Sequence, residues 1–251
     1  MVDIYDPDYV KGVFDRCSGK YIAFSFVCSL GFTERWRRQC VEAMPAPLSP
    51  SAHGYDLMAG TGEVWPHLLK RYADIKSIIA VDISSGMHVR AMERLHAHRA
   101  QKIDFIEDDL LASNLPPESA DFVISTFGLK TFNAEQHARL ANLLARVLKP
   151  GGVFSMIEAS DPKGWWLRPL YLFHLKVLLP IIESAFHVPT RVQFDRPNPG
   201  PYSQTAAPYL EWSTESEPFP LAEIIEAWGA GTGTTSDAVS PATGEPDTGL
   251  Q

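Results

Sequence analysis

The sequence predicts an α/β protein in which a doubly wound, mostly parallel sheet carries helices on both faces. Between residues 55 and 160, short apolar runs alternate strictly with helical patterns, which is the element order of a parallel sheet with crossover helices. The apolar runs are continuous rather than alternating, as expected of strands that are buried on both faces. These two observations together favour a Rossmann-like arrangement.

The expected elements follow one another in this order. Residues 1–44 read as helical and should form an N-terminal helical cap ahead of the core. Strands are expected at residues 55–59, 77–84, 102–109, 120–128 and 153–160, and helices between them at residues 63–73, 86–100 and 134–149. We expect residues 45–228 to form one ligand-binding domain.

The pattern changes after the fifth strand. An apolar helical block at residues 165–187, with the proline-rich stretch behind it, predicts a helical lid and loop insertion over residues 165–208. One last helix is expected at residues 221–228. Residues 229–251 are rich in Gly, Thr, Ser and Pro and poor in large apolar side chains, so we expect a disordered tail.

Composition argues against several classes of partner. The net charge of -8 would repel a nucleic acid, and the eight histidines offer no metal-site spacing, so neither partner is expected. The three cysteines form no C-x-x-C pair and indicate a reducing cytoplasm. The N-terminus lacks a signal-peptide pattern, and the apolar stretches at residues 21–32 and 170–186 are too short to span a bilayer. We expect a cytoplasmic protein without transmembrane segments; a peripheral membrane contact and a homodimer stay open.

A glycine loop follows the first predicted strand. The segment YDLMAGTGEVW, residues 55–65, places Asp56 four residues ahead of a Gly-Thr-Gly. In doubly wound sheets ligands bind at the carboxyl ends of the strands, and Gly60 and Gly62 let the backbone approach them closely. Asp82 ends the second strand, about 20 residues on, where a carboxylate can accept both ribose hydroxyls. The loop therefore predicts a nucleoside ligand.

Two residues favour S-adenosylmethionine over a dinucleotide. The dinucleotide fingerprint needs a small third residue so that helix and strand pack closely, and Trp65 stands in that place. Asp56 suits the ammonium of a methionyl group better than a pyrophosphate anion. A dehydrogenase is therefore only the third hypothesis for this loop.

At this point the residues resemble class I S-adenosylmethionine-dependent methyltransferases, and within them the ubiquinone/menaquinone biosynthesis (UbiE-like) methyltransferases. The general part of the resemblance is the glycine loop, the acidic strand ends, and the motif LKPGG. The narrower part is four ordered motifs: SLGFTERW, TFGLKTF, EASDP and EWSTESEPFP, which begin at residues 29, 126, 158 and 211. The resemblance runs from about residue 14 to residue 220.

The resemblance implies a set of cofactor contacts. Asp109 and Leu110 should flank the adenine, and Thr126 stands where the family usually has Ser. The complete expected set is Tyr21, Asp56, Ala59, Gly60, Thr61, Gly62, Asp82, Ile83, Met87, Asp109, Leu110 and Thr126. The cofactor implied is S-adenosyl-L-methionine.

The acceptor side departs from the family pattern. Thr33 and Glu34 replace a His-Arg pair, and Lys130 and Thr131 replace Arg-Asn, although Lys does not substitute for the planar fork of Arg. Candidates for contact with the acceptor are Phe127, Lys130, Asp161 and His174, and no catalytic base is assigned. The family usually closes its sheet with a C-terminal antiparallel hairpin, and none can be read here. We therefore expect another chain or the helical block to cover the exposed edge of the fifth strand.

Two functional hypotheses follow. The first is a methyltransferase that transfers a methyl group to carbon or oxygen of an apolar aromatic, quinol-like or polyketide-like small molecule. The alternative is a homologue that binds the cofactor without methylating and serves as a partner subunit, or uses the cofactor for another, non-redox reaction. The intact cofactor positions favour the first, and the altered acceptor loops and missing hairpin favour the second.

Overall fold

The computed structural model of the 251-residue chain describes residues 3–45, 48–98, 102–158, 166, 168–178, 181 and 209–213. The expected last helix at residues 221–228 and the expected tail at residues 229–251 lie outside the described residues.

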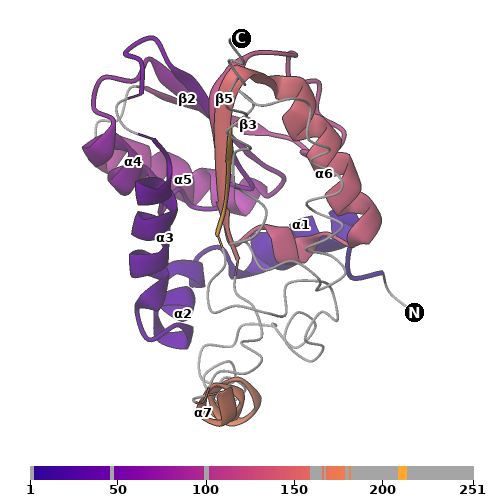
Figure 1. Cartoon of the computed structure of the whole chain (residues 1–251). Coiled ribbons are helices and arrows are strands. Elements are labelled where there is room, and N and C mark those ends of the chain that lie inside the picture. The colour runs from indigo at the N-terminus through magenta and orange to yellow at the C-terminus, as the bar shows by residue number, and fades with distance from the viewer. Residues whose placement is uncertain are drawn as a thin grey trace, which may run out of the picture.

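A six-stranded sheet forms the centre of the protein, with the strand order β3-β2-β1-β4-β5-β6 (Figure 1). The strands are β1 (His53–Leu57), β2 (Ser77–Asp82), β3 (Ile103–Glu107), β4 (Ala120–Thr126), β5 (Leu148–Ile157) and β6 (Tyr209–Ser213). The first five are parallel, as the sequence predicts. From β1 the chain adds β2 and β3 on one side of the sheet, and then β4 and β5 on the other side of β1. Ligands of doubly wound sheets bind at this switch point.

Burial explains why the strands read as continuous apolar runs. In β4, the consecutive residues Phe122, Val123 and Ile124 are all fully buried. Because successive side chains of a strand point to opposite faces, both faces of the sheet must be covered. Figure 1 shows this layering, with α3, α4 and α5 on one side of the sheet and α6 on the other.

The helices lie close to their predicted positions. They are α1 (Pro7–Cys17), α2 (Tyr21–Cys28), α3 (Phe32–Ala43), α4 (Trp65–Arg71), α5 (Ser85–His98), the short 3₁₀ helix η1 (Leu129–Thr131) and α6 (Ala134–Val147). α6 begins with a capping box, in which the side chains of Asn133 and Gln136 each accept a hydrogen bond from the backbone amide of the other residue. This box satisfies two amides that the first turn of the helix leaves unpaired.

The expected turn at LKPGG is part of β5. The strand begins directly after α6, at Leu148, and its pairing with β4 is irregular between Ala120 and Phe122. Gly151 there has a φ of 79°, a backbone conformation that glycine adopts most readily. The glycine motif therefore shapes an irregular strand start rather than a separate turn.

The expectation that the edge of the fifth strand lacks a partner from its own chain was wrong. β6 pairs antiparallel with β5, from Val153 opposite Ser213 to Ile157 opposite Tyr209. Neither a second chain nor the helical block has to cover this edge. Within the described residues a single strand follows β5, rather than a hairpin. A strand of five residues behind a proline-rich stretch gives little local signal, because its pairing comes from distant β5.

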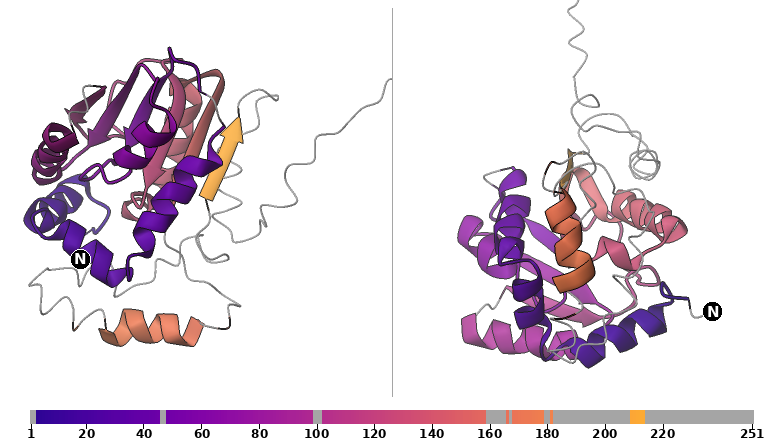
Figure 2. Two further views of the ribbon diagram at one scale, coloured as in Figure 1. Left: turned by 90° about the vertical axis from the view of Figure 1, so that its left-hand side faces the viewer. Right: turned by 90° about the horizontal axis from the view of Figure 1, so that it is seen from below.

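The block after the fifth strand is helical where the structure describes it. α7 (Arg168–Phe173) continues as the π-helical turn η2 (His174–Leu178). Figures 1 and 2 place α7 at the end of the molecule where α1 and α2 lie. The ring Nε2 of His174 lies within hydrogen-bonding distance of the Cys28 carbonyl oxygen at the end of α2.

Candidate active site

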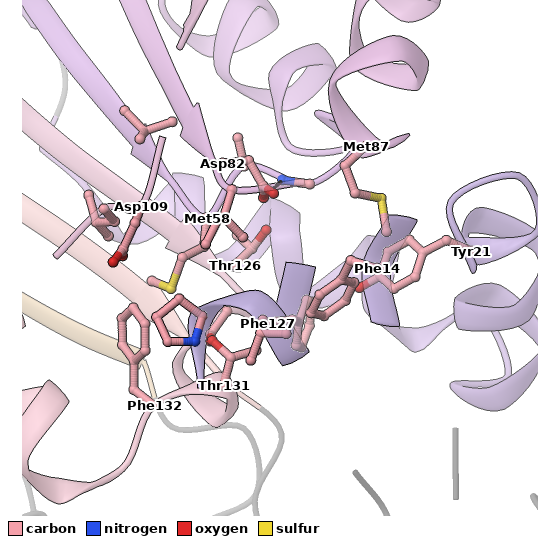
Figure 3. A pocket seen from close by; sticks show the side chains of 18 of the residues that line it. Phe14, Tyr21, Met58, Asp82, Met87, Asp109, Thr126, Phe127, Thr131 and Phe132 are labelled. Carbon is pink, nitrogen blue, oxygen red and sulfur yellow. Dashed lines mark hydrogen bonds between the residues drawn. The ribbon is translucent and has the colours of Figure 1, made fainter. Parts of the chain in front are cut away.

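A pocket lies at the carboxyl ends of β1, β2 and β4, with α1 and α2 on its other side (Figure 3). The lining residues are Tyr5, Pro7, Val10, Phe14, Tyr21, Arg37, Met58, Ala59, Gly60, Glu63, Val81, Asp82, Ile83, Met87, Asp109, Leu110, Thr126, Phe127, Gly128, Thr131, Phe132 and Gln136. It holds about 810 Å³ of space, part of which is open to solvent. Cofactor and small-molecule pockets typically have volumes of about 300–1,000 Å³, so this pocket suits such a ligand.

The glycine loop presents bare backbone to the pocket at one position. Gly60 has a φ of 57°, and a Cβ added there would have no heavy atom within 4 Å. Gly62, with a φ of 72°, is different, because an added Cβ would come within 2.4 Å of the Trp65 ring. Gly60 therefore leaves space for a ligand, whereas Gly62 leaves space for the indole.

Asp82 closes the loop from the neighbouring strand. One of its carboxylate oxygens accepts a hydrogen bond of 2.8 Å from the Gly60 amide, and the other accepts one of 2.9 Å from the Ser84 amide. Burial raises the pKa of Asp82, and the two amide hydrogen bonds act in the opposite direction. Each carboxylate oxygen has a second lone pair, so both can still accept a hydrogen bond from the hydroxyls of a ribose.

Asp56 was expected to contact the cofactor, but it does not line the pocket. It is 1% exposed, and one of its carboxylate oxygens accepts a 2.7 Å hydrogen bond from the indole Nε1 of Trp65. The reason is the two-residue period of β1: Tyr55 and Leu57 face α6, so Asp56 points to the opposite face, which α4 covers. Its other oxygen, Oδ1, is buried and has no hydrogen-bond partner among the described residues.

Of the remaining loop residues, some line the pocket and others lie behind it. Ala59 lines the pocket, but Thr61 is fully buried behind it, and neither Thr61 nor Gly62 belongs to the lining. The Thr61 carbonyl accepts a 2.9 Å hydrogen bond from Arg94 of α5. These two residues therefore shape the loop from behind rather than forming its ligand-facing surface.

The structure brings the other expected cofactor residues together. Tyr21, Ile83, Met87, Asp109, Leu110 and Thr126 all line the pocket with Asp82. Figure 3 shows Asp82 between Asp109 on one side and Met87 with Tyr21 on the other. One oxygen of Asp109 accepts a 3.0 Å hydrogen bond from the Leu111 amide. That bond fixes the carboxylate at the pocket, next to the apolar side chain of Leu110.

Of the three acceptor candidates that the structure describes, only Phe127 lines the pocket. Lys130 lies beside it: its Nζ is 6.0 Å from the Phe127 ring centroid and 3.8 Å from a carboxylate oxygen of Glu158. His174 contacts the end of α2, as described above, and is not among the lining residues. Asp161 lies outside the described residues.

The sequence pattern did not indicate several of the lining residues. The N-terminal segment and α1 contribute Tyr5, Pro7, Val10 and Phe14, because α1 packs across α5 near the strand ends. Arg37, Met58, Glu63, Phe132 and Gln136 also line the pocket. The amphipathic pattern of α1 predicts a buried face but does not indicate what that face covers.

The residues present fit a nucleoside cofactor. Gly60 leaves open space beside its Cα, and Asp82 has free acceptor lone pairs. The Asp109 carboxylate can accept a hydrogen bond from the amino group of a base. The apolar side chains of Leu110 and Met87 can cover a flat ring. This donor and acceptor set suits an adenosine.

Residues 2–189 match the model of the ubiE/COQ5 methyltransferase family. The chain belongs to this family. It is 36% identical over 179 residues to the demethylmenaquinone methyltransferase of Renibacterium salmoninarum, which covers 71% of this chain and 70% of the relative. It is 32% identical over 213 residues to the demethylmenaquinone methyltransferase of Symbiobacterium thermophilum, covering 84% of this chain and 80% of the relative.

A solved structure shows the same fold at lower identity. Phosphoethanolamine N-methyltransferase 1 of Haemonchus contortus, in complex with phosphoethanolamine and S-adenosylhomocysteine, superposes with a TM-score of 0.51 and 20% identity. The match covers 62% of this chain and 32% of that chain.

The resemblance to UbiE-like methyltransferases is thus confirmed, and the chain is an S-adenosylmethionine-dependent methyltransferase. Its doubly wound fold is confirmed as well. No helix in the described part of the chain has both the length and the apolar character needed to cross a membrane.

Proposed function

We propose that this methyltransferase transfers the methyl group of S-adenosylmethionine to a ring carbon of a quinol-like aromatic. The observation that carries the proposal is the aromatic wall of the pocket. Phe14, Tyr21, Phe127 and Phe132 line the same pocket as Asp82 (Figure 3). Flat, apolar rings bind against such walls by offset stacking and edge contacts.

The names of the relatives support the same acceptor class. Two of them are demethylmenaquinone methyltransferases, and a third, from Xanthomonas oryzae, is a ubiquinone/menaquinone biosynthesis C-methyltransferase with 29% identity over 178 residues. We therefore favour a quinol over a polyketide, and carbon over oxygen as the methylated atom.

The cofactor supplies an activated methyl group on a sulfonium. A ring carbon next to a phenolic hydroxyl forms the new carbon–carbon bond, and the electron pair of the broken carbon–sulfur bond goes to sulfur. The ring carbon then loses its proton, which is released to solvent. The protein has to align the ring behind the methyl group and exclude water. The apolar side chains of Phe14, Met58 and Phe127 at the pocket are suited to both tasks.

For the cofactor itself we propose contacts from the lining members of the predicted set. These are Tyr21, Ala59, Gly60, Asp82, Ile83, Met87, Asp109, Leu110 and Thr126. In this proposal Asp56, Thr61 and Gly62 act indirectly, by holding the shape of the loop.

The non-methylating alternative loses its main support. It depended on a missing C-terminal hairpin and on altered acceptor loops, and the single strand β6 covers the edge that the hairpin would cover. Of the altered residues, Glu34 does not line the pocket and instead pairs with Arg37 and His67.

A tritiated-methyl assay tests the proposal. The purified chain is incubated with labelled S-adenosylmethionine and either a short-chain prenylated naphthohydroquinone, its oxidised quinone, or a catechol. We expect label on the hydroquinone only, because the quinone lacks the electron-rich ring, and mass spectrometry should place the methyl group on a ring carbon. Label on oxygen, or transfer to the catechol alone, would contradict the proposal.

A further inference from the structure

A buried ion pair lies in the wall of the pocket. Arg37 of α3 is 3% exposed and Glu63, in the glycine loop, is 8% exposed. A terminal nitrogen of Arg37 is 3.7 Å from the Glu63 Oε2. This distance is too long for a hydrogen bond, so the two charges face each other without a direct bond.

The pair is incompletely satisfied among the described residues. The Nε of Arg37 and the Oε1 of Glu63 are both buried and have no hydrogen-bond partner there. The other terminal nitrogen of Arg37 donates a 3.0 Å hydrogen bond to Glu34. Because leaving buried atoms of charged groups without hydrogen bonds is destabilising, stability alone does not explain why both residues face a pocket.

The order of the strands places the pair relative to the other polar groups. Asp109 follows β3, Asp82 ends β2, and the glycine loop with Glu63 follows β1. Arg37 lies beyond them on the β4 side, where its guanidinium is 5.4 Å from the ring centroid of Phe127. The pocket thus has acceptors suited to an adenosine at one end and a buried cation and anion at the other.

We propose that Arg37 and Glu63 bind the amino-acid end of the cofactor, with the guanidinium on its carboxylate and the Glu63 carboxylate on its ammonium. This inference rests on the proposed use of S-adenosylmethionine. The zwitterionic amino-acid end carries one anionic and one cationic group, so it offers a partner of opposite charge to each residue. A quinol hydroxyl can donate to Glu63 and accept from Arg37, but it is neutral and brings no opposite charge to either residue.

Ligand truncation tests the proposal without the acceptor. Calorimetric titration compares S-adenosylhomocysteine with 5′-methylthioadenosine, which lacks the amino-acid end, on the wild type and on Arg37→Met and Glu63→Gln. Both variants should bind S-adenosylhomocysteine about 10- to 100-fold more weakly, while the dissociation constant for 5′-methylthioadenosine stays within about twofold. Arg38→Met is the matched control, because Arg38 lies next in α3, is exposed, and pairs with Glu42 on the surface.

Two further ligands assign each residue to its group. For decarboxylated S-adenosylhomocysteine, Arg37→Met should bind as the wild type does, and Glu63→Gln should still be weaker. For the deaminated analogue, Glu63→Gln should bind as the wild type does, and Arg37→Met should still be weaker. Binding of 5′-methylthioadenosine shows in each case that the pocket is folded.

The wild type alone can overturn the inference, even if a variant fails to fold. If removing the amino-acid end from the ligand weakens wild-type binding less than threefold, the pair does not bind that end. If the variants lose affinity equally for S-adenosylhomocysteine and 5′-methylthioadenosine, the pair has a structural role only. Unchanged binding of both ligands in the two variants would mean that the pair does not contact the cofactor. Since no acceptor is present in the titrations, a failed quinol assay leaves these results unaffected.

Discussion

The indole Nε1 of Trp65 donates a hydrogen bond of 2.7 Å to the buried carboxylate of Asp56. Trp65 is 1% exposed, and its ring occupies the space above Gly62. The residue whose size argues against a dinucleotide loop therefore also satisfies the acidic residue at the start of that loop. The two positions are energetically coupled.

Trp65→Phe should keep much of the ring contact and lose the donor. A buried acid then lacks its partner, so we expect the free energy of unfolding to fall by about 1–3 kcal/mol. Urea denaturation measures the effect. Trp166→Phe is the control, since Trp166 is 80% exposed and the substitution should leave the midpoint unchanged. Equal midpoints for the two variants would show that the hydrogen bond contributes nothing.

Asp56 should make stability depend on pH. Its pKa is raised to about 8, mainly by burial, while the hydrogen bond from Trp65 acts in the opposite direction. In the unfolded chain an aspartate ionises near pH 3.9, so between about pH 4 and pH 8 the folded state holds a proton that the unfolded state has lost. The free energy of unfolding therefore decreases with rising pH across this window, by at most about 1.4 kcal/mol per pH unit.

The measurement is a comparison with Asp56→Asn, which cannot ionise. Urea denaturation at pH 5 and at pH 8 should show the variant gaining stability relative to the wild type at the higher pH. A stability difference that is the same at both pH values would mean that Asp56 is already ionised in the folded protein at pH 5.

Alanine at the two glycines of the loop should affect different properties: ligand binding at Gly60 and stability at Gly62. At Gly60 the added methyl group enters open pocket space, so Gly60→Ala should weaken S-adenosylhomocysteine binding at least tenfold, with a strain of about 1–2 kcal/mol from its φ of 57°. At Gly62 the methyl group would overlap Trp65, so Gly62→Ala should add about 1–3 kcal/mol of overpacking to a similar strain. Titration and urea denaturation on both variants test this contrast. The assignment of Gly60 to the ligand side fails if both variants bind equally well.

The pairing of β6 with β5 can be tested by truncation. A chain that ends at residue 213 retains β6, and a chain that ends at residue 208 loses it. The shorter chain exposes the edge of β5, so it should be less stable in urea and should self-associate in sedimentation. If the two chains have the same stability and remain monomeric alike, β6 does not protect this edge.

Much of the fold could be predicted because its signals are local. Continuous apolar runs give the parallel strands, and their carboxyl ends must meet at one edge of the sheet. This is why Gly60, Asp82 and Asp109 were expected in one site, and all three line the pocket. β6 gave no comparable signal, because its backbone is satisfied by hydrogen bonds to a strand more than 50 residues earlier in the chain.

The sequence by itself determined the family, the parallel sheet and the acidic strand ends, since each depends on residue types at short spacing. Only the tertiary structure decided that Asp56 turns away from the pocket toward Trp65, and that Arg37 meets Glu63 in its wall. The physical reason is that direction and contact depend on packing. The pleat of β1 sets the face that Asp56 occupies, and the docking of α3 on β4 and β5 carries Arg37 to a loop more than 20 residues away.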